Sequence, residues 1–240
     1  MTHFTRADWV ITTPPFTKQH YPSIMPARKK RSNPTNVVGA AYGRAIRNSG
    51  PKVRTSGTAV RVSNKEFFAN MSSSDVSGQR TKGILNFQPH TSSLWLGTIA
   101  KGYTYHRVHK LKFHYVPAAA TDINGYIELG FFYDNEDANA WYEGSGSGLS
   151  QNKHYLTAPP WGGASNNMDG GQCLTVDVSN PHLPWFRCDT GGTDYAQASL
   201  NLIGTLAVSV VSSEVNYLCG RVFVEYDVEF REPVMAVHNA

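Results

Sequence analysis

Residues 222–230 read Val-Phe-Val-Glu-Tyr-Asp-Val-Glu-Phe, and every second side chain in this stretch is apolar. Successive side chains of a β-strand point to opposite faces of the sheet, so the alternation predicts a strand with one buried face. The acids Glu225, Asp227 and Glu229 fall together on the other face, which we expect to be exposed or at an interface. No paired acid and base of the kind that catalysis needs is evident on that face.

Seven more segments have strand patterns and are divided by turn residues. They are Ala59–Phe68, Gly83–Phe87, Tyr105–Val116, Gly125–Tyr133, Cys173–Val178, Trp185–Arg187 and Leu202–Val211. Two other stretches, Ser93–Gly102 and Glu136–Tyr142, fit one or two helical turns between strands. Eight strands without long alternating helices predict an all-β protein, with residues 58–240 forming an eight-stranded jelly-roll sandwich. An immunoglobulin-type sandwich is the alternative.

Charge divides the chain into two parts. Residues 1–65 contain twelve Lys or Arg and one acid, a net +11, whereas residues 66–240 contain ten Lys or Arg and seventeen acids, a net −7; the sum is the overall +4. The basic part has few large apolar residues between Arg28 and Gly57, so it cannot bury enough surface to offset its ordering entropy. We therefore expect residues 1–57 to form a flexible basic N-terminal arm.

The first 24 residues differ in composition from the rest of the arm, and their role stays open. Met25 begins a stretch, Met-Pro-Ala-Arg-Lys-Lys-Arg, that resembles the start of a basic-armed protein. We hypothesise that Met25 is a second initiation site, or that residues 1–24 are a separately used arm.

The cations of the arm are spread along it. Eleven lie between residues 9 and 65 with no acid among them. A nuclear address needs one short cluster, whereas neutralising a phosphate backbone rewards every additional charge, so the spread favours nucleic-acid binding over an address or a solubility tail. Aromatic residues are sparse there, which predicts electrostatic binding that is largely blind to sequence. The candidate RNA-binding residues are Arg28, Lys29, Lys30, Arg31, Arg44, Arg47, Lys52 and Arg54.

Several classes of protein are excluded by what the sequence lacks. It has no apolar run long enough for a membrane span and no secretory signal. The cysteines, Cys173, Cys188 and Cys219, are odd in number and lack a CxxC pair, so we expect reduced thiols rather than disulfides or zinc ligands. A cupin-like metalloenzyme would need clustered ligands, but His106 and His109 are an odd number apart on one strand and point to opposite faces. With no hydrolase or dinucleotide-binding glycine motif either, we expect no enzyme.

Four blocks of sequence resemble the shell domain of the coat proteins of tombusviruses and their relatives, including sobemoviruses. They are 60–70, 87–106, 111–137 and 220–233, and they follow the family's order. The resemblance implies a capsid subunit of a small icosahedral positive-strand RNA virus, which self-assembles into a shell with T=3 quasi-symmetry. It further implies packaging of single-stranded genomic RNA by the arm, assembly in the host cytoplasm, residence in the virion and no membrane partner. As in sobemoviruses, no protruding second domain is expected.

A carboxylate pair follows the strand that ends at Tyr133. Asp134 and Asp137 are three residues apart at the start of an expected helical turn, a spacing that lets both carboxylates face one way. In the resembling coat proteins the matching pair holds Ca²⁺ at a subunit interface, and Ca²⁺ accepts several oxygen ligands, some from a neighbouring subunit. The further donor candidates are Asn239, Asp189 and Asp194. The alternative is a solvated acidic turn, or carboxylates that stabilise a helix start.

A cellular jelly-roll binding module, such as a lectin with a polyanion-binding tail, is the competing function. It would explain the sandwich but not the acid-free run of cations, and it predicts a small discrete oligomer instead of closed shells.

Overall fold

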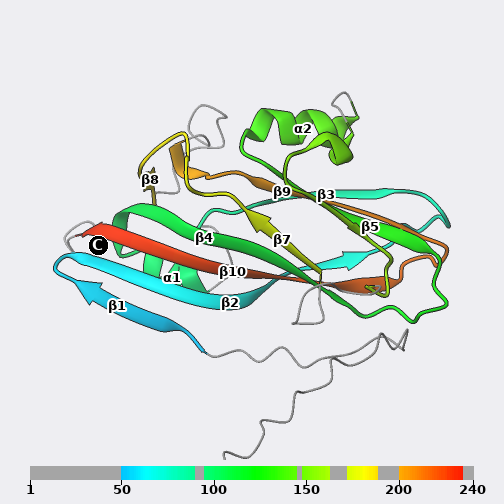
Figure 1. Ribbon diagram of the computed structural model, residues 1–240, viewed down its shortest axis with the longest axis horizontal. Helices are drawn as coiled ribbons and strands as arrows, with labels where there is room; N and C mark the ends of the chain where they lie inside the picture. The colour runs from blue at the N-terminus through cyan, green and yellow to red at the C-terminus, as the bar shows by residue number, and fades with distance from the viewer. Residues whose placement is uncertain (1–49, 90–94, 145–147, 163–171, 189–199, 235–240) are drawn as a thin grey trace, which may run out of the picture. The chain divides into compact units, whose positions relative to one another are not determined.

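A computed structural model describes residues 50–89, 95–144, 148–162, 172–188 and 200–234, all within the unit Val38–Ala240. They form two antiparallel sheets (Figure 1). The larger sheet has the order β1 (Lys52–Ser56), β2 (Ala59–Ser72), β10 (Leu218–Pro233), β4 (Tyr103–Pro117) and β7 (Gln172–Val176), with β8 (Phe186–Arg187) also beside β4. The smaller sheet has the order β3 (Thr81–Asn86), β9 (Thr205–Ser212), β5 (Gly125–Phe132) and β6 (Tyr155–Ala158).

The path of the chain between the two sheets identifies the architecture. The chain passes from β2 in the larger sheet to β3 in the smaller, returns to β4, crosses to β5 and β6, returns to β7, crosses to β9 and ends in β10. Without the added strands β1 and β8, each sheet has four strands, and two four-stranded antiparallel sheets joined in this way are a jelly roll. The predicted fold class is thus confirmed.

The predicted strands match the structure except that β8 was predicted in place of β6 as the eighth strand of the jelly roll. All eight predicted segments contain strands, but Trp185–Arg187 yields only the two-residue β8, which is an addition to the eight-stranded frame. The eighth frame strand is β6, which the sequence did not predict because four residues are too few for a clear alternation. The sequence also did not predict β1. Its five residues, Lys-Val-Arg-Thr-Ser, show no apolar alternation, and all five are exposed.

The core lies between the two sheets. On one face of the 222–230 stretch, Val222, Val224, Tyr226, Val228 and Phe230 are all buried, as the alternation predicted, and they pack in one cluster with Phe113 of β4 and Phe131 of β5. Burying such side chains contributes roughly 1.5–3 kcal/mol each, which makes this shared core the main stabilising term.

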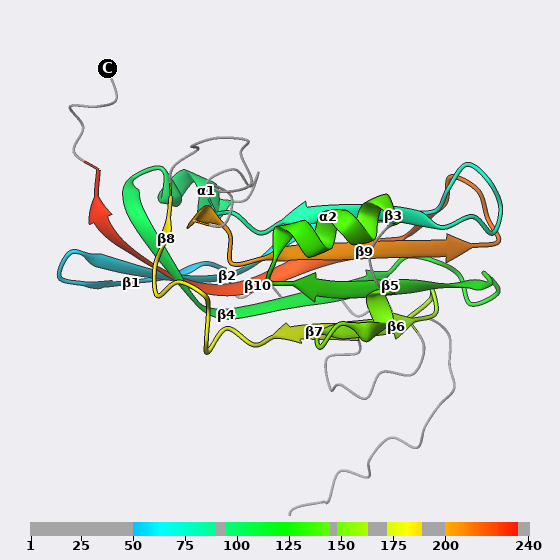
Figure 2. The same ribbon diagram turned by 90° about the horizontal axis from the view of Figure 1, so that it is seen from above.

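Two helices accompany the sheets. The six-residue α1 (Trp95–Ala100) adds Leu96 and Ala100 to the core. The helix α2 (Asn135–Glu143) lies over the smaller sheet (Figure 2), where Trp141 packs against Ala207 of β9. Within the described ranges, no helix has the length and apolar character that crossing a lipid bilayer requires.

Candidate functional site

The outer face of the larger sheet, which points away from the core, carries a row of ion pairs. Arg61 of β2 donates from Nε and Nη2 to the two carboxylate oxygens of Asp227, at 2.7 and 2.8 Å. On β4, His109 Nε2 lies 2.6 Å from Glu229. Glu225 is shared by two bases of β4: Lys110 donates to one oxygen, and Nε2 of a histidine, His114, lies 2.8 Å from the other. These seven residues are called the charged ladder below.

All the acids of the ladder come from one strand, β10. Strand β10 is central, and its neighbours β2 and β4 supply all the bases. Sequence patterning placed the three acids on one face correctly, but it could not find their partners. Arg61 and Asp227 are 166 residues apart in the chain, and only the strand register brings them together.

A β-bulge in β4 sets the direction of the ladder's bases. Asp227 is paired with Lys110 and Val228 with Val108, so His109 is an extra residue opposite no partner. His109 and Lys110 consequently both reach the acids of β10, although they are adjacent in sequence. Re-aiming a side chain in this way is a common effect of a bulge.

The two histidines lie on opposite faces, as predicted from their odd spacing. His106 is fully buried on the inner face and stacks on Phe186, whereas His109 lies in the ladder. Across the described residues, no three His, Cys, Asp or Glu side chains gather closely enough to hold a metal ion.

The electrostatics of the ladder favour its charged forms. The hydrogen bond from His114 is the main cause that lowers the pKa of Glu225 to about 2, with Lys110 adding to it. For Asp227, burial would raise the pKa, but the Arg61 guanidinium outweighs it and the pKa falls. Burial would likewise lower the pKa of His114, yet its hydrogen bonds to Cys173 and Glu225 raise it.

Two candidate RNA-binding residues lie on the outer face as well. Lys52 and Arg54 are exposed on β1, and the register sets them opposite Ser63 and Arg61 of β2. Residues directly opposite each other in an antiparallel pair share a face, so both cations extend the face of the ladder. The structure thus places them in a strand, within the range 1–57 assigned to the arm. The other six candidates, Arg28, Lys29, Lys30, Arg31, Arg44 and Arg47, and also Met25, lie outside the described residues.

The predicted carboxylate pair lies at the start of α2. Asp134 is the N-cap: its Oδ1 accepts a hydrogen bond of 2.8 Å from the Glu136 backbone N–H. Asp137 follows in the first helical turn, where the helix dipole favours an acid. At the other end, Lys82 Nζ donates to the carbonyl of Trp141 at 2.8 Å. The helix-start role is therefore filled by one oxygen of Asp134.

The remaining oxygens of the pair suit a hard cation. Both side chains are exposed, and within the described part of the chain no Lys, Arg or His forms an ion pair with either. The other oxygen of Asp134 and the Asp137 carboxylate are the donor type that Ca²⁺ prefers, but Ca²⁺ needs six to eight such ligands. The further candidates, Asp189, Asp194 and Asn239, lie outside the described residues.

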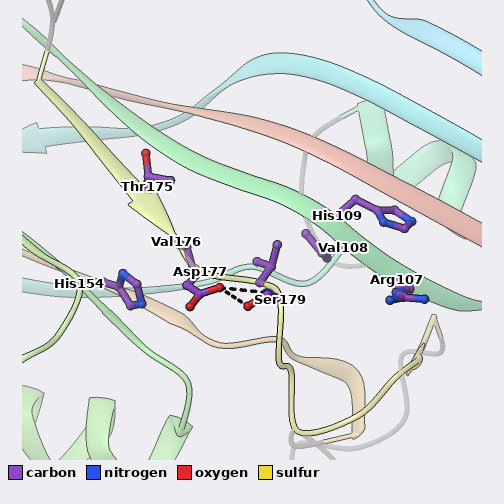
Figure 3. Close-up of a pocket in the computed structure, with 9 residues that line it drawn as sticks. Arg107, Val108, His109, His154, Thr175, Val176, Asp177 and Ser179 are labelled. Atoms are coloured by element: carbon purple, nitrogen blue, oxygen red, sulfur yellow. Dashed lines mark hydrogen bonds between the residues drawn. The ribbon is translucent and has the colours of Figure 1, made fainter.

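A pocket of about 520 Å³ opens beside the part of β4 that pairs with neither β7 nor β8 on that edge (Figure 3). Two of its lining residues, Asp177 and Ser179, are hydrogen-bonded to each other. Asp177 accepts hydrogen bonds from the backbone and hydroxyl of Ser179, which are the main causes that lower its pKa to about 2. The Tyr133 hydroxyl lies 2.7 Å from His154 Nε2 and donates to the Asp177 carbonyl at 2.5 Å. These bonds fasten the segment that leads into Asp134.

Comparison with known proteins gives one family. The family model described as viral coat protein (S domain) matches residues 34–236. The capsid protein of Cucumber necrosis virus is 27% identical over 199 residues, covering 80% of this chain and 48% of the relative. The capsid protein of Tobacco necrosis virus (strain D) is 27% identical over 201 residues, covering 77% of this chain and 72% of the relative. The chain spans about half the length of several of these relatives, 48–56% in three of them.

Solved structures agree on the fold. A tobacco necrosis virus structure gives a TM-score of 0.68 at 22% identity and covers 82% of this chain and 92% of its own. The Cucumber Necrosis Virus crystal structure gives 0.65 at 22% identity, covering 86% and 61%. The relatives are structural proteins, and the predicted absence of an enzymatic role agrees with them. With its jelly roll and a family match over residues 34–236, the chain belongs to the viral coat protein (S domain) family.

Proposed function

We propose that this chain assembles with copies of itself into an icosahedral shell with T=3 quasi-symmetry and packages single-stranded RNA through its basic N-terminal arm. The observation that carries the proposal is a net charge of +11 in residues 1–65 joined to a jelly roll of the coat-protein family. On this proposal the protein assembles in the host cytoplasm and resides in the virion, without a membrane partner.

The physical basis for RNA packaging is counterion release. Each phosphate of single-stranded RNA that a cation neutralises contributes about −0.7 to the slope of log K against log salt. The nine cations between residues 9 and 57 are therefore additive, and the net charge of −7 in residues 66–240 discourages RNA from covering the whole domain.

The surface of the domain offers side chains suited to contacts between copies. Large aromatic side chains remain more than a third exposed at Phe67, Trp95, Tyr126 and Tyr142. Aromatic residues are enriched in protein–protein interfaces because they bury much area with few rotatable bonds. These side chains support self-association of the folded domain.

Removal of residues 27–47 tests the role of the arm. This deletion takes out six candidate cations and spares β1, whose pairing with β2 belongs to the sheet. We expect empty or smaller shells, seen by negative-stain microscopy, with loss of the absorbance of RNA at 260 nm. A matched variant keeps the length but replaces these six cations with Gln, and it should lose RNA equally. Particles of unchanged RNA content would contradict the proposal, and small discrete oligomers from the unaltered chain would favour the binding-module alternative.

We also propose Asp134 and Asp137 as ligands of Ca²⁺ at a contact between subunits, with Asn239, Asp189 or Asp194 of a neighbouring copy as further donors. Bound Ca²⁺ would neutralise the two carboxylates and bridge the copies. The support is the exposure of both carboxylates and their lack of a cationic partner among the described residues.

The calcium site is tested by swelling. Chelator at about pH 8 should lower the sedimentation coefficient of native particles, because freed carboxylates repel each other. Asp137→Asn particles should be swollen before chelation and bind less Ca²⁺. Glu143→Gln, an exposed acid at the far end of the same helix, should behave as the native chain does. Equal Ca²⁺ uptake by native and Asp137→Asn particles would rule this site out.

A further inference from the structure

Three chemically complementary side chains lie in line across the outer face of the larger sheet. Cys173 of β7 is directly opposite His114 of β4. On its other side, His114 Nε2 lies 2.8 Å from Glu225 of β10. The order carboxylate, imidazole, thiol is the one in which a base activates a sulfur nucleophile and an acid orients the base.

The surroundings favour a charged pair of imidazolium and thiolate. Burial would raise the pKa of Cys173, but the hydrogen bond from His114 outweighs it, and Thr175 and Lys112 also lower this pKa. Burial and the positive charge of Lys65 on β2 would lower the pKa of His114, but its hydrogen bonds with Cys173 and Glu225 outweigh them and raise this pKa. Lys110 is a further charge at this cluster and is bound to the other oxygen of Glu225.

The three cysteines differ in access. Cys188 is 3% exposed and Cys219 is fully buried, whereas Cys173 is only partly buried on the edge strand of the sheet. Burial also raises the pKa of Cys219 and so disfavours its thiolate. A reactive thiol needs both exposure and thiolate character, and Cys173 combines them.

We propose that Cys173 is a modification site, a thiolate positioned by His114 and Glu225 that undergoes exchange with low-molecular-weight disulfides. The Cys173 sulfur attacks one sulfur of the disulfide, a new S–S bond forms, and the original S–S bond breaks. The cysteine is oxidised, and half of the disulfide is reduced and leaves as a thiolate. The proton lost by Cys173 remains on His114, held by Glu225, or passes to solvent. This role is independent of shell assembly and RNA binding.

The probe is 5,5′-dithiobis(2-nitrobenzoate), an aromatic disulfide whose leaving thiolate is coloured, applied to the native full-length chain. We expect one rapidly reacting thiol per chain, absent in Cys173→Ser and retained in Cys188→Ser. At about pH 6, His114→Gln should react about fivefold or more slowly, because less thiolate is present. At about pH 9 the two rates should converge to within about twofold.

The matched control is His109→Gln, which removes the other ladder histidine and its pair with Glu229 but lies away from the thiol. It should keep the native rate at both pH values. Glu225→Gln provides a second variant, which should slow the reaction at low pH by removing the charge that stabilises the imidazolium. If a variant unfolds, all three thiols react, so the stoichiometry reports it.

Two results would overturn the proposal. One is a rapid phase that persists in Cys173→Ser. The other is a rate at low pH that is the same in His114→Gln, His109→Gln and the native chain.

Discussion

Glu225 and His114 form a pair whose contribution to stability is confined to a range of pH. The folded pKa of Glu225, about 2, lies below its ordinary value of 4.5, so its stabilisation is complete above about pH 4.5 and lost as the pH falls toward 2. The folded pKa of His114 lies above its ordinary value of 6.5, so its stabilisation is complete below that value and lost as the pH rises through the folded pKa. The pair therefore stabilises most between about pH 4.5 and 6.5.

A double-mutant cycle measures this dependence. The changes are His114→Gln, Glu225→Gln and both together, and the free energies of unfolding come from urea titration of the RNA-free chain. We expect a coupling energy of about 1–2 kcal/mol at about pH 5.5 and less than about 0.5 kcal/mol at about pH 9. Lys110 stays bound to Glu225 in the His114 variant, so the cycle isolates the histidine. A coupling energy that does not change with pH would show that the imidazolium charge is unimportant.

Strand β4 holds its core contacts only because of its bulge. His106 and Val108 are buried before the bulge, and Leu111 and Phe113 are buried after it. The step from Val108 to Leu111 is an odd number of residues, so in a regular strand without the bulge the two halves would face opposite sides.

Deleting His109 should therefore leave a folded domain, because it makes the step from Val108 to Leu111 two residues and turns the bulge into regular pairing with β10. We expect soluble protein whose free energy of unfolding in urea lies within about 1 kcal/mol of that of His109→Ala, since both variants lose only the partly exposed pair with Glu229. Deleting Lys112, in the regular part of the same strand, should instead give no soluble folded protein in a fractionation assay, because it moves the two halves of β4 to opposite faces. An insoluble His109 deletion variant beside soluble His109→Ala would contradict this account of the bulge.

At the level of elements, the predictability of the fold depended on the length of the alternation. Strand β10 was predicted because sixteen residues alternate over most of their length. Strand β6, with four residues, carries too short a pattern, and β1 is all polar or exposed. The partners of the ladder were out of reach for a different reason: they depend on register between strands far apart in the chain, and on a bulge that local patterning does not reveal.

For the whole molecule, the division of charge was visible from the sequence, but the position of its boundary was not. Lys52 and Arg54 read as part of a flexible arm, since their stretch lacks large apolar residues. The structure places them on a strand beside the ladder, because backbone pairing with β2 can order a segment that has no core side chains.

These two cations should contribute to RNA binding as fixed charges. Replacing both with Gln should make the slope of log K against log salt shallower by about 1.4, if each neutralises one phosphate. The measurement is fluorescence anisotropy of an unstructured oligoribonucleotide over a salt series. The control is Lys101→Gln with Lys153→Gln, two exposed cations outside the outer face, which should leave the slope unchanged. Equal slopes for both pairs would show that β1 does not touch RNA.

The central place of β10 in the larger sheet has a consequence for folding during synthesis. This strand pairs with β2 on one side and β4 on the other, yet it is the last of the described strands to leave the ribosome. While the nascent chain grows, the facing edges of β2 and β4 have no strand between them, and pairings across such long separations form slowly. Closure of the larger sheet must therefore wait until translation has passed β10.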